Sequence, residues 1–202
     1  SLGRWEISVR LVDFNSTDVD FEEARRSFPS VKLHVIPLAL PFLFGLALQR
    51  GADSVVQLQR DEHGDISPDD VLLITDVDTR YPLTLFSRLE RSVQVGATFW
   101  APIYSWERKD GSINPPCNDH RGCGNMAMSV GDFRRTDGWN GPILYKKTHG
   151  YHDTYLVLAL KKLGLRAIRQ IEPDVVSLWH ERSSKSEWYS DQAVSDVEND
   201  RE

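Results

Sequence analysis

Eight residues, Val-Leu-Leu-Ile-Thr-Asp-Val-Asp at positions 71–78, constrain the fold of this chain more than any other stretch. The apolar run predicts a strand buried on both faces, as found in parallel sheets that helices cover. It ends in Asp76 and Asp78, whose side chains point to the same side of a strand. Because open α/β sheets bind ligands beyond the carboxyl ends of their strands, we expect both carboxylates to line a binding crevice.

The two carboxylates also predict a cation. Two acids placed together at the end of an apolar strand are costly unless a positive charge neutralises them. The natural partner is a hard divalent ion, Mn²⁺ or Mg²⁺, shared with phosphate oxygens. The Asp-x-Asp pattern therefore makes Asp76 and Asp78 candidate residues for binding a metal and a phosphorylated ligand.

Strand patterns alternate with helix patterns along the rest of the chain, which is typical of an α/β domain with a mainly parallel sheet. Strands are expected at residues 6–12, 31–36, 71–78, 98–104, 125–130, 166–171 and 175–179. Helices are expected at residues 18–28, 41–50, 81–96 and 153–163, with Thr17 or Asp18 capping the first and Gly51 and Gly164 ending the second and the fourth. Loops are expected at residues 57–70, 105–124 and 132–150, and loops of this length more often form binding surfaces than spacers.

Composition narrows the range of partners. The 202 residues fit one domain, residues 1–182, followed by a Ser-, Glu- and Asp-rich tail at 183–202 that is expected to be disordered. The net charge of −6 argues against a duplex nucleic-acid partner. No apolar run approaches the roughly 20 residues that a membrane helix needs. Cys117 and Cys123, with His120 between them, supply only half of a zinc ligand set, so a loop disulfide or two free thiols is expected.

Two further residues, His180 and Asp153, are candidates for a chemical role. His180 directly follows an apolar strand pattern, and neutral imidazole suits Mn²⁺ beside carboxylate oxygens. The simpler interpretation is a histidine satisfied by Glu181. Asp153 stands at the start of a helix pattern after a glycine-containing loop, where it could serve as a general base toward a sugar hydroxyl. Its simpler interpretation is a helix N-cap, because Asp fills that position without any further function.

Taken in order, several stretches resemble one family of enzymes. The runs VLLITDVDTRYP, APIYSWE, GCGNMAMSVGDFRRTDGWNG, HGYHDTYLVLALKKLGL and SLWHER resemble the catalytic domain of metal-dependent GT-A glycosyltransferases. The resemblance is strongest to the chondroitin synthase and chondroitin N-acetylgalactosaminyltransferase group, related to the β-1,4-galactosyltransferases, and it covers residues 9–182. It implies a Rossmann-like, three-layer GT-A fold with a mainly parallel mixed sheet. It also implies a UDP-sugar donor, Mn²⁺ or Mg²⁺, a glycan acceptor, and transfer that inverts the anomeric carbon.

The resemblance also implies a role for each candidate residue. Asp78 matches the second aspartate of the DxD motif, which binds the metal, and Asp76 matches the first, which faces the ribose and the metal. His180 matches the metal-binding histidine of a Trp-His-Glu segment. Asp153 matches the last acid of a Gly-Trp-Gly-Gly-Glu-Asp segment, the catalytic base. Asp13 resembles an acid that hydrogen-bonds uracil, although capping its own turn is the simpler interpretation.

The chain departs from the family pattern at two places. His152 stands where the family has the glutamate before the base, and Tyr151 with its neighbours replaces Trp-Gly-Gly. The strand and helix that open a GT-A domain do not precede residue 6, so we expect this chain to be part of a longer polypeptide. The resemblance implies the cytoplasm for a bacterial protein and the Golgi lumen for a eukaryotic one.

Two other functions are compatible with parts of the pattern. Haloacid-dehalogenase phosphatases also end a strand in Asp-x-Asp, but they have Thr or Val where Arg80 stands here. A catalytically degenerate glycosyltransferase domain that binds sugars or a protein partner is the second alternative. Hydrolysis of a UDP-sugar in the presence of Mn²⁺ would separate it from an active enzyme.

Overall fold

The computed structural model describes residues 5–14, 16–17, 19–39, 44–57, 66–116, 124–136, 138–139 and 152–181. These residues form a mixed α/β protein with parallel and antiparallel strand pairs. The chain divides into two compact units, residues 1–67 with 139–145, and residues 68–138 with 146–202. The predicted tail, both cysteines and His120 lie outside the described residues.

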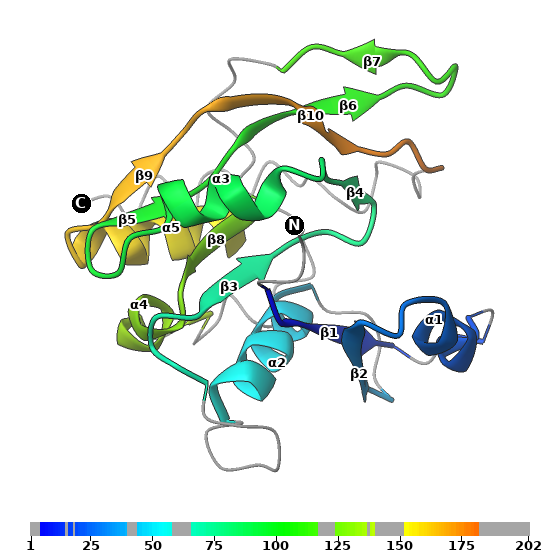
Figure 1. Cartoon of the computed structure of the whole chain (residues 1–202), viewed down its shortest axis with the longest axis horizontal. Coiled ribbons are helices and arrows are strands. Elements are labelled where there is room, and N and C mark those ends of the chain that lie inside the picture. Colours follow the sequence, from blue (N-terminus) through cyan, green and yellow to red (C-terminus); the bar gives the residue numbers. More distant parts are fainter. Residues whose placement is uncertain are drawn as a thin grey trace, which may run out of the picture. The chain divides into compact units, whose positions relative to one another are not determined.

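Unit 1 is built on two parallel strands, β1 (Ile7–Asp13) and β2 (Val31–Pro37). They pair from Ile7 opposite Val31 to Asp13 opposite Pro37. Helix α1 (Phe21–Ser27) connects the strands, and helix α2 (Phe44–Gln57) packs on β1 (Figure 1). The structure thus confirms the strands and helices predicted for this part of the chain.

Two helix ends in unit 1 differ from the prediction. The cap of α1 is Asp20, whose Oδ1 accepts the backbone N–H groups of Glu22 at 2.9 Å and Glu23 at 3.0 Å, so the prediction of Thr17 or Asp18 was wrong. Helix α2 does not stop at Gly51 but continues to Gln57, with Ala52 buried just beyond the glycine. Burial of the following turn outweighs the local preference of glycine for a helix end.

Unit 2 contains two four-stranded sheets. The first has the order β3-β8-β5-β9 and the second the order β4-β10-β6-β7. Their strands are β3 (Val71–Ile74), β4 (Thr79–Arg80), β5 (Thr98–Trp100), β6 (Ile103–Glu107), β7 (Ile113–Asn114), β8 (Met126–Ser129), β9 (Arg166–Ile168) and β10 (Ile171–Ser177).

Backbone hydrogen bonds carry the parallel pairing from one sheet into the other. The N–H of Ala101 donates to the carbonyl of Ile168 at 3.1 Å, and the N–H of Ile103 donates to Gln170 at 2.8 Å. Strands β5 and β6 therefore run alongside β9 and β10 as two long parallel ribbons (Figure 1). The predicted strand at residues 98–104 accordingly becomes two strands, one in each sheet.

The strand that pairs with β3 runs in the opposite direction to the one predicted. Strand β3 pairs antiparallel with β8, from Val71 opposite Ser129 to Ile74 opposite Met126, so the expected parallel neighbour was wrong for this pair. Every residue of β8 is buried. Only Leu72 of β3 is buried, and the other three residues of the strand are partly buried, so the predicted burial on both faces is present only in part. An apolar run also does not indicate the direction of the strand beside it, because helices can cover either kind of sheet.

Two regions expected to be loops contain regular structure. Helix α4 (Val130–Arg135) lies at the start of the predicted 132–150 loop, and Ser129 caps it by accepting the N–H of Asp132 at 3.0 Å. Strand β7 lies in the predicted 105–124 loop and forms a hairpin with the end of β6. Both elements are too short to show a clear periodicity in the sequence.

The helices of unit 2 cover its first sheet. Helix α3 (Leu85–Ser92) packs on β5, α4 on β8, and α5 (His152–Lys162) on β9 (Figure 1). Gly164 ends α5 as predicted, with φ +87° and a bond from its N–H to Lys161 at 2.9 Å. The buried core joins α3 to both sheets through Leu85, Leu89, Trp100, Tyr104, Ala127 and Val175.

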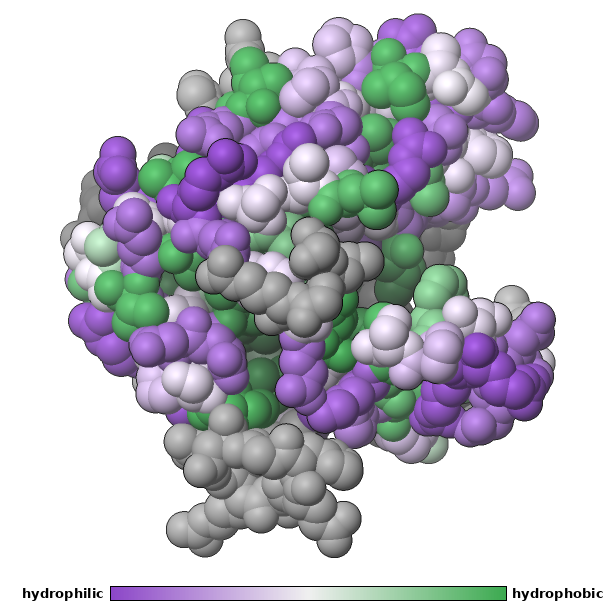
Figure 2. All heavy atoms as spheres, in the orientation of Figure 1, coloured by the Kyte–Doolittle hydropathy of each residue, from purple (hydrophilic) through white to green (hydrophobic). Residues whose placement is uncertain are grey.

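Hydrophilic residues cover much of the face drawn in Figure 2, with apolar residues scattered among them. Within the described part of the chain, no helix is both long and apolar enough to cross a bilayer.

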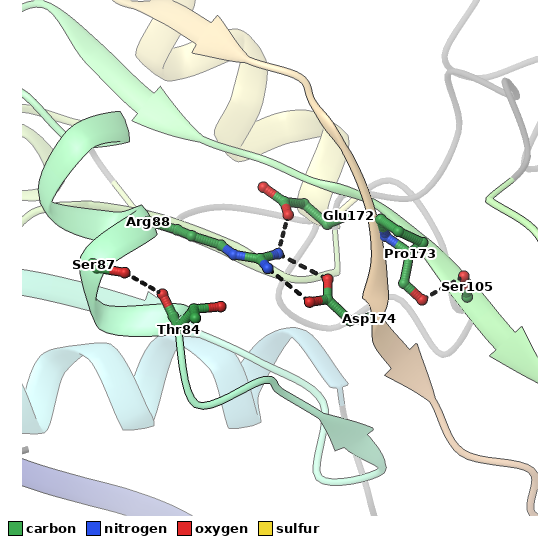
Figure 3. Close-up of polar contacts among 7 residues, drawn as sticks. All are labelled: Thr84, Ser87, Arg88, Ser105, Glu172, Pro173 and Asp174. Carbon is green, nitrogen blue, oxygen red and sulfur yellow. Dashed lines mark hydrogen bonds and ion pairs between the residues drawn. The ribbon is translucent and has the colours of Figure 1, made fainter. Parts of the chain in front are cut away.

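An ionic cluster fixes an irregularity in β10. The pairing between β10 and β6 shifts register between Glu172 and Val176. Arg88 of α3 binds the carboxylates of Glu172 and Asp174 on either side of Pro173, with bonds to Asp174 of 2.7 and 2.8 Å (Figure 3). Arg88 thereby holds the pKa of Asp174 below its usual range. Because the side chain of Glu172 is 10% exposed, its charge depends on this arginine.

Replacing Arg88 by Met is expected to destabilise unit 2 by about 3 kcal/mol, because the buried Glu172 carboxylate loses its counter-ion. Adding Glu172→Gln to this variant is expected to recover about half of the loss. Urea unfolding of the two variants beside the wild type measures both effects. Equal stability of the Arg88→Met variant and the wild type would contradict the assignment.

Candidate functional site

Asp78 and His180 meet although they are far apart in the sequence. Asp78 directly precedes β4, which pairs antiparallel with β10 so that Thr79 lies opposite Ser177. Beyond this pair, the N–H of Leu178 donates to the carbonyl of Asp78 at 2.7 Å. These bonds bring Nε2 of His180 to 3.2 Å from Oδ2 of Asp78. The convergence that the sequence predicted for these two side chains is therefore present.

The two ring nitrogens of His180 face different oxygen atoms. Nε2 faces the Asp78 carboxylate, and Nδ1 lies 3.2 Å from the carbonyl oxygen of Glu181. Either nitrogen can donate to the oxygen it faces when it carries a proton, and a nitrogen without a proton can bind a cation. A cation bound by Nε2 would lie beside the Asp78 oxygen. The side chain of His180 is 57% exposed, so the pair is open to solvent and to a ligand.

Asp76 lies in an environment that disfavours its charge. Burial, together with the negative charges of Asp78 and then Asp153, raises the pKa of its carboxyl to about 6, and His180 opposes them. A Cβ atom at Gly124 would lie 2.9 Å from Oδ2 of Asp76, so the backbone of residue 124 closes over this carboxylate. Asp76 therefore sits in a narrow space where a cation would stabilise it.

A hydrogen-bond network borders Asp76, and the sequence did not reveal it. The Tyr81 hydroxyl donates to Oγ1 of Thr75 or to Oδ1 of Asn125, each at 2.8 Å, and Thr75 Oγ1 lies 2.9 Å from the same amide oxygen. Burial raises the pKa of Tyr81, so its phenol stays protonated. Asn125 is fully buried, and its Nδ2 has no hydrogen-bond partner among the residues that the structure describes. The polar Asn125 at the start of an apolar strand pattern was the available signal.

Asp153 is near this site but is not the N-cap that its simpler interpretation required. Helix α5 begins at His152, so Asp153 lies inside the first turn. An acid there interacts favourably with the helix dipole. The charge of Asp153 contributes to the raised pKa of Asp76, which places the two carboxylates within electrostatic reach of each other. His152 is buried, at 1% exposed, and is less accessible than Asp153.

Asp13 lies in unit 1, at the carboxyl end of β1. Its Oδ1 accepts the N–H of Ser16 at 3.1 Å, and its carbonyl accepts the N–H of Leu38 at 2.7 Å. The bond from Ser16 is the turn-capping role given above as the simpler interpretation of Asp13. The uracil contact stays a prediction.

Asp78 and His180 form a two-residue site. Within the described ranges, no three His, Cys, Asp or Glu side chains are arranged to hold one ion. A carboxylate and an imidazole suit Mn²⁺ or Mg²⁺, whose other positions phosphate oxygens and water commonly fill. The part of Asp76 as a third ligand stays a prediction.

The metal-free protein is expected to lose stability as the pH rises through about 6. The pKa of Asp76 is raised from 3.8 to about 6 by folding, so the folded protein holds this proton more tightly than the unfolded chain. The resulting stabilisation is complete below about pH 4 and is lost as the pH rises through the folded-state pKa. The loss amounts to at most about 3 kcal/mol. Urea unfolding in EDTA between pH 4.5 and 8 measures it, and Asp76→Asn is expected to flatten the profile. An unchanged profile in this variant would assign the dependence to other groups.

No protein-family model and no curated protein matches this sequence. The chemistry of the site therefore rests on its own side chains.

Proposed function

We propose that this chain is the catalytic domain of a metal-dependent, inverting glycosyltransferase that moves a sugar from a UDP-sugar to a hydroxyl group of a glycan. The observation that carries the proposal is the 3.2 Å contact between His180 and Asp78, with two further carboxylates, Asp76 and Asp153, in electrostatic reach. A site with this much negative charge favours a divalent cation and, through it, a phosphorylated substrate.

The mixed α/β architecture supports the GT-A fold as a proposal. Unit 1 places two parallel strands side by side, as a nucleotide-binding half requires. In unit 2 a strand followed by Asp76 and Asp78 lies in a sheet that helices cover. The mixture of parallel and antiparallel pairs fits a GT-A sheet, which is mixed rather than purely parallel.

The residues divide the chemistry between them. Asp78 and His180 would hold Mn²⁺ or Mg²⁺, which neutralises negative charge on a departing diphosphate when bound. When Nδ1 of His180 donates to the carbonyl of Glu181, Nε2 is left with a lone pair for the ion. The backbone of Gly124 lies close to the Asp76 carboxylate, which is within electrostatic reach of Asp78 and His180.

Asp153 is assigned the role of general base. It would accept the proton of the acceptor hydroxyl as that oxygen bonds to the anomeric carbon and the bond to the diphosphate breaks. The attack comes from the face opposite the leaving group, so one displacement inverts the configuration. Its position in the first turn of α5 places the carboxylate at the positive end of the helix dipole.

Removing either member of the pair is expected to weaken Mn²⁺ binding. Asp78→Asn and His180→Ala should each lower the affinity by at least about tenfold, because each removes one of two protein ligands. Calorimetric titration with MnCl₂ measures this. Glu90→Gln on the exposed face of α3 is the control for loss of one negative charge elsewhere in unit 2. Wild-type affinity in both site variants would exclude the pair as the metal site.

The base can be tested apart from stability and donor binding. Asp153→Asn keeps the size and hydrogen bonding of the side chain but cannot accept the proton, so turnover is expected to fall by about 10²–10⁴-fold. UDP-sugar affinity and melting temperature should stay near wild type. Transfer and hydrolysis are measured with a panel of UDP-sugars and Mn²⁺. Wild-type turnover in this variant would place the base elsewhere, with His152 the next candidate.

The alternative of a degenerate, sugar-binding domain predicts a different result in the same assay. It predicts that the wild-type protein binds a UDP-sugar with Mn²⁺ but neither transfers nor hydrolyses it. An active phosphatase would instead release phosphate from simple phosphate esters.

A further inference from the structure

A broad depression lies on unit 2 between the β6–β7 hairpin and the segment that follows β10. It has a volume of about 590 Å³, within the usual range of ligand pockets of about 300–1,000 Å³, and it opens widely to solvent. Two tryptophans, one amide and three charged side chains line it: Trp106, Glu107, Arg108, Lys109, Asn114 and Trp179.

Strand pairing positions Trp106, and a hydrogen bond to Glu107 positions the backbone of Trp179. Trp106 lies in β6 between Ser177 of β10 and Asn114 of β7. Its ring packs against Tyr104 with the centroids 5.5 Å apart and the planes tilted by 51°. The backbone N–H of Trp179 donates to the Glu107 carboxylate at 3.1 Å. The aromatic walls are therefore fixed by the same sheet that brings His180 to Asp78.

Trp179 presents its ring to the surface. The residue is 43% exposed, and Lys109 Nζ lies 5.6 Å from the ring centroid. This cation stabilises the ring and covers part of it. Large aromatic side chains that stay exposed at fixed positions are typical anchors of binding sites, because they bury much apolar area at little entropic cost.

The mixture of groups in the depression matches one kind of ligand. A sugar ring has an apolar face of C–H groups and an edge of hydroxyls that both donate and accept hydrogen bonds. The indole rings offer surfaces for the face, while Asn114, Glu107 and Lys109 offer partners for the edge. A purely apolar ligand would leave these polar groups without compensation.

We infer that this depression binds a sugar ring of the glycan acceptor, other than the ring that receives the new sugar. The inference rests on the proposed function, which supplies the glycan. Trp179 directly precedes His180, so the aromatic wall lies about one residue, roughly 3.8 Å along the backbone, from the candidate metal ligand. A glycan that reaches the site could therefore extend over Trp179 and be held there during transfer.

The test measures oligosaccharide binding without metal or nucleotide. Chitohexaose, cellohexaose and a hexasaccharide of alternating glucuronate and N-acetylhexosamine are titrated into the protein in EDTA, with the tryptophan indole N–H signals followed by NMR. At least one hexasaccharide is expected to bind and to shift the signals of Trp106 and Trp179. Trp179→Ala should weaken its binding at least about tenfold, whereas Trp179→Phe, which keeps an aromatic face, should stay within about threefold.

Two further variants sharpen the result. Asn114→Ala alters a different wall and is expected to weaken binding at least about threefold through one lost hydrogen bond. Phe28→Ala removes an exposed aromatic ring that lies outside the depression and should change nothing. Failure of all three hexasaccharides to bind, or wild-type affinity in both Trp179→Ala and Asn114→Ala, would overturn the inference.

The outcome is separable from that of the proposed function. Asp78→Asn is expected to lose Mn²⁺-dependent UDP-sugar binding while keeping oligosaccharide affinity. If the wild type binds the hexasaccharide through Trp179 but never binds a UDP-sugar, the transferase proposal fails and the glycan site stands. If donor binding is intact and no hexasaccharide binds, the glycan site fails alone.

Discussion

The antiparallel pairing of β4 with β10 is the interaction on which the rest of the candidate site depends. It places Ser177 opposite Thr79 and lets Leu178 bond to the carbonyl of Asp78. Two segments about a hundred residues apart are thereby joined at the position of the paired acids. The same stretch of β10 pairs with β6 on its other side, so it positions Trp106 as well. A single strand thus aligns the Asp78–His180 pair and the aromatic depression.

Strand β10 can occupy this position because its register is not uniform. Between Glu172 and Val176 the pairing with β6 shifts, and Arg88 holds the shifted residues through Glu172 and Asp174 (Figure 3). Without this shift every later residue of β10 would lie opposite a different residue of β6. The arginine therefore links the packing of α3 to the alignment of His180, although it lies outside the site.

The candidate site concentrates negative charge around Asp76. Burial of Asp76 and the negative charges of Asp78 and Asp153 all disfavour the ionised form of the Asp76 carboxyl. Folding such a group of acids costs free energy in the absence of a cation, which is common where a protein keeps residues for binding rather than for stability. The proposed transferase chemistry uses this repulsion, because a divalent ion and a diphosphate both relieve it.

The sequence alone determined the local features, and the tertiary structure decided which of them meet. Apolar periodicity located β1, β2, β3 and α5, and Gly164 marked a helix end, because these signals come from neighbouring residues. The sequence also singled out Asp78 and His180 as chemically suitable. Their 3.2 Å contact, the antiparallel partner of β3, the closure of Gly124 over Asp76 and the Trp106–Trp179 depression depend on long-range pairing. Hydrophobic pattern specifies burial but neither the direction of a neighbouring strand nor its register with distant ones.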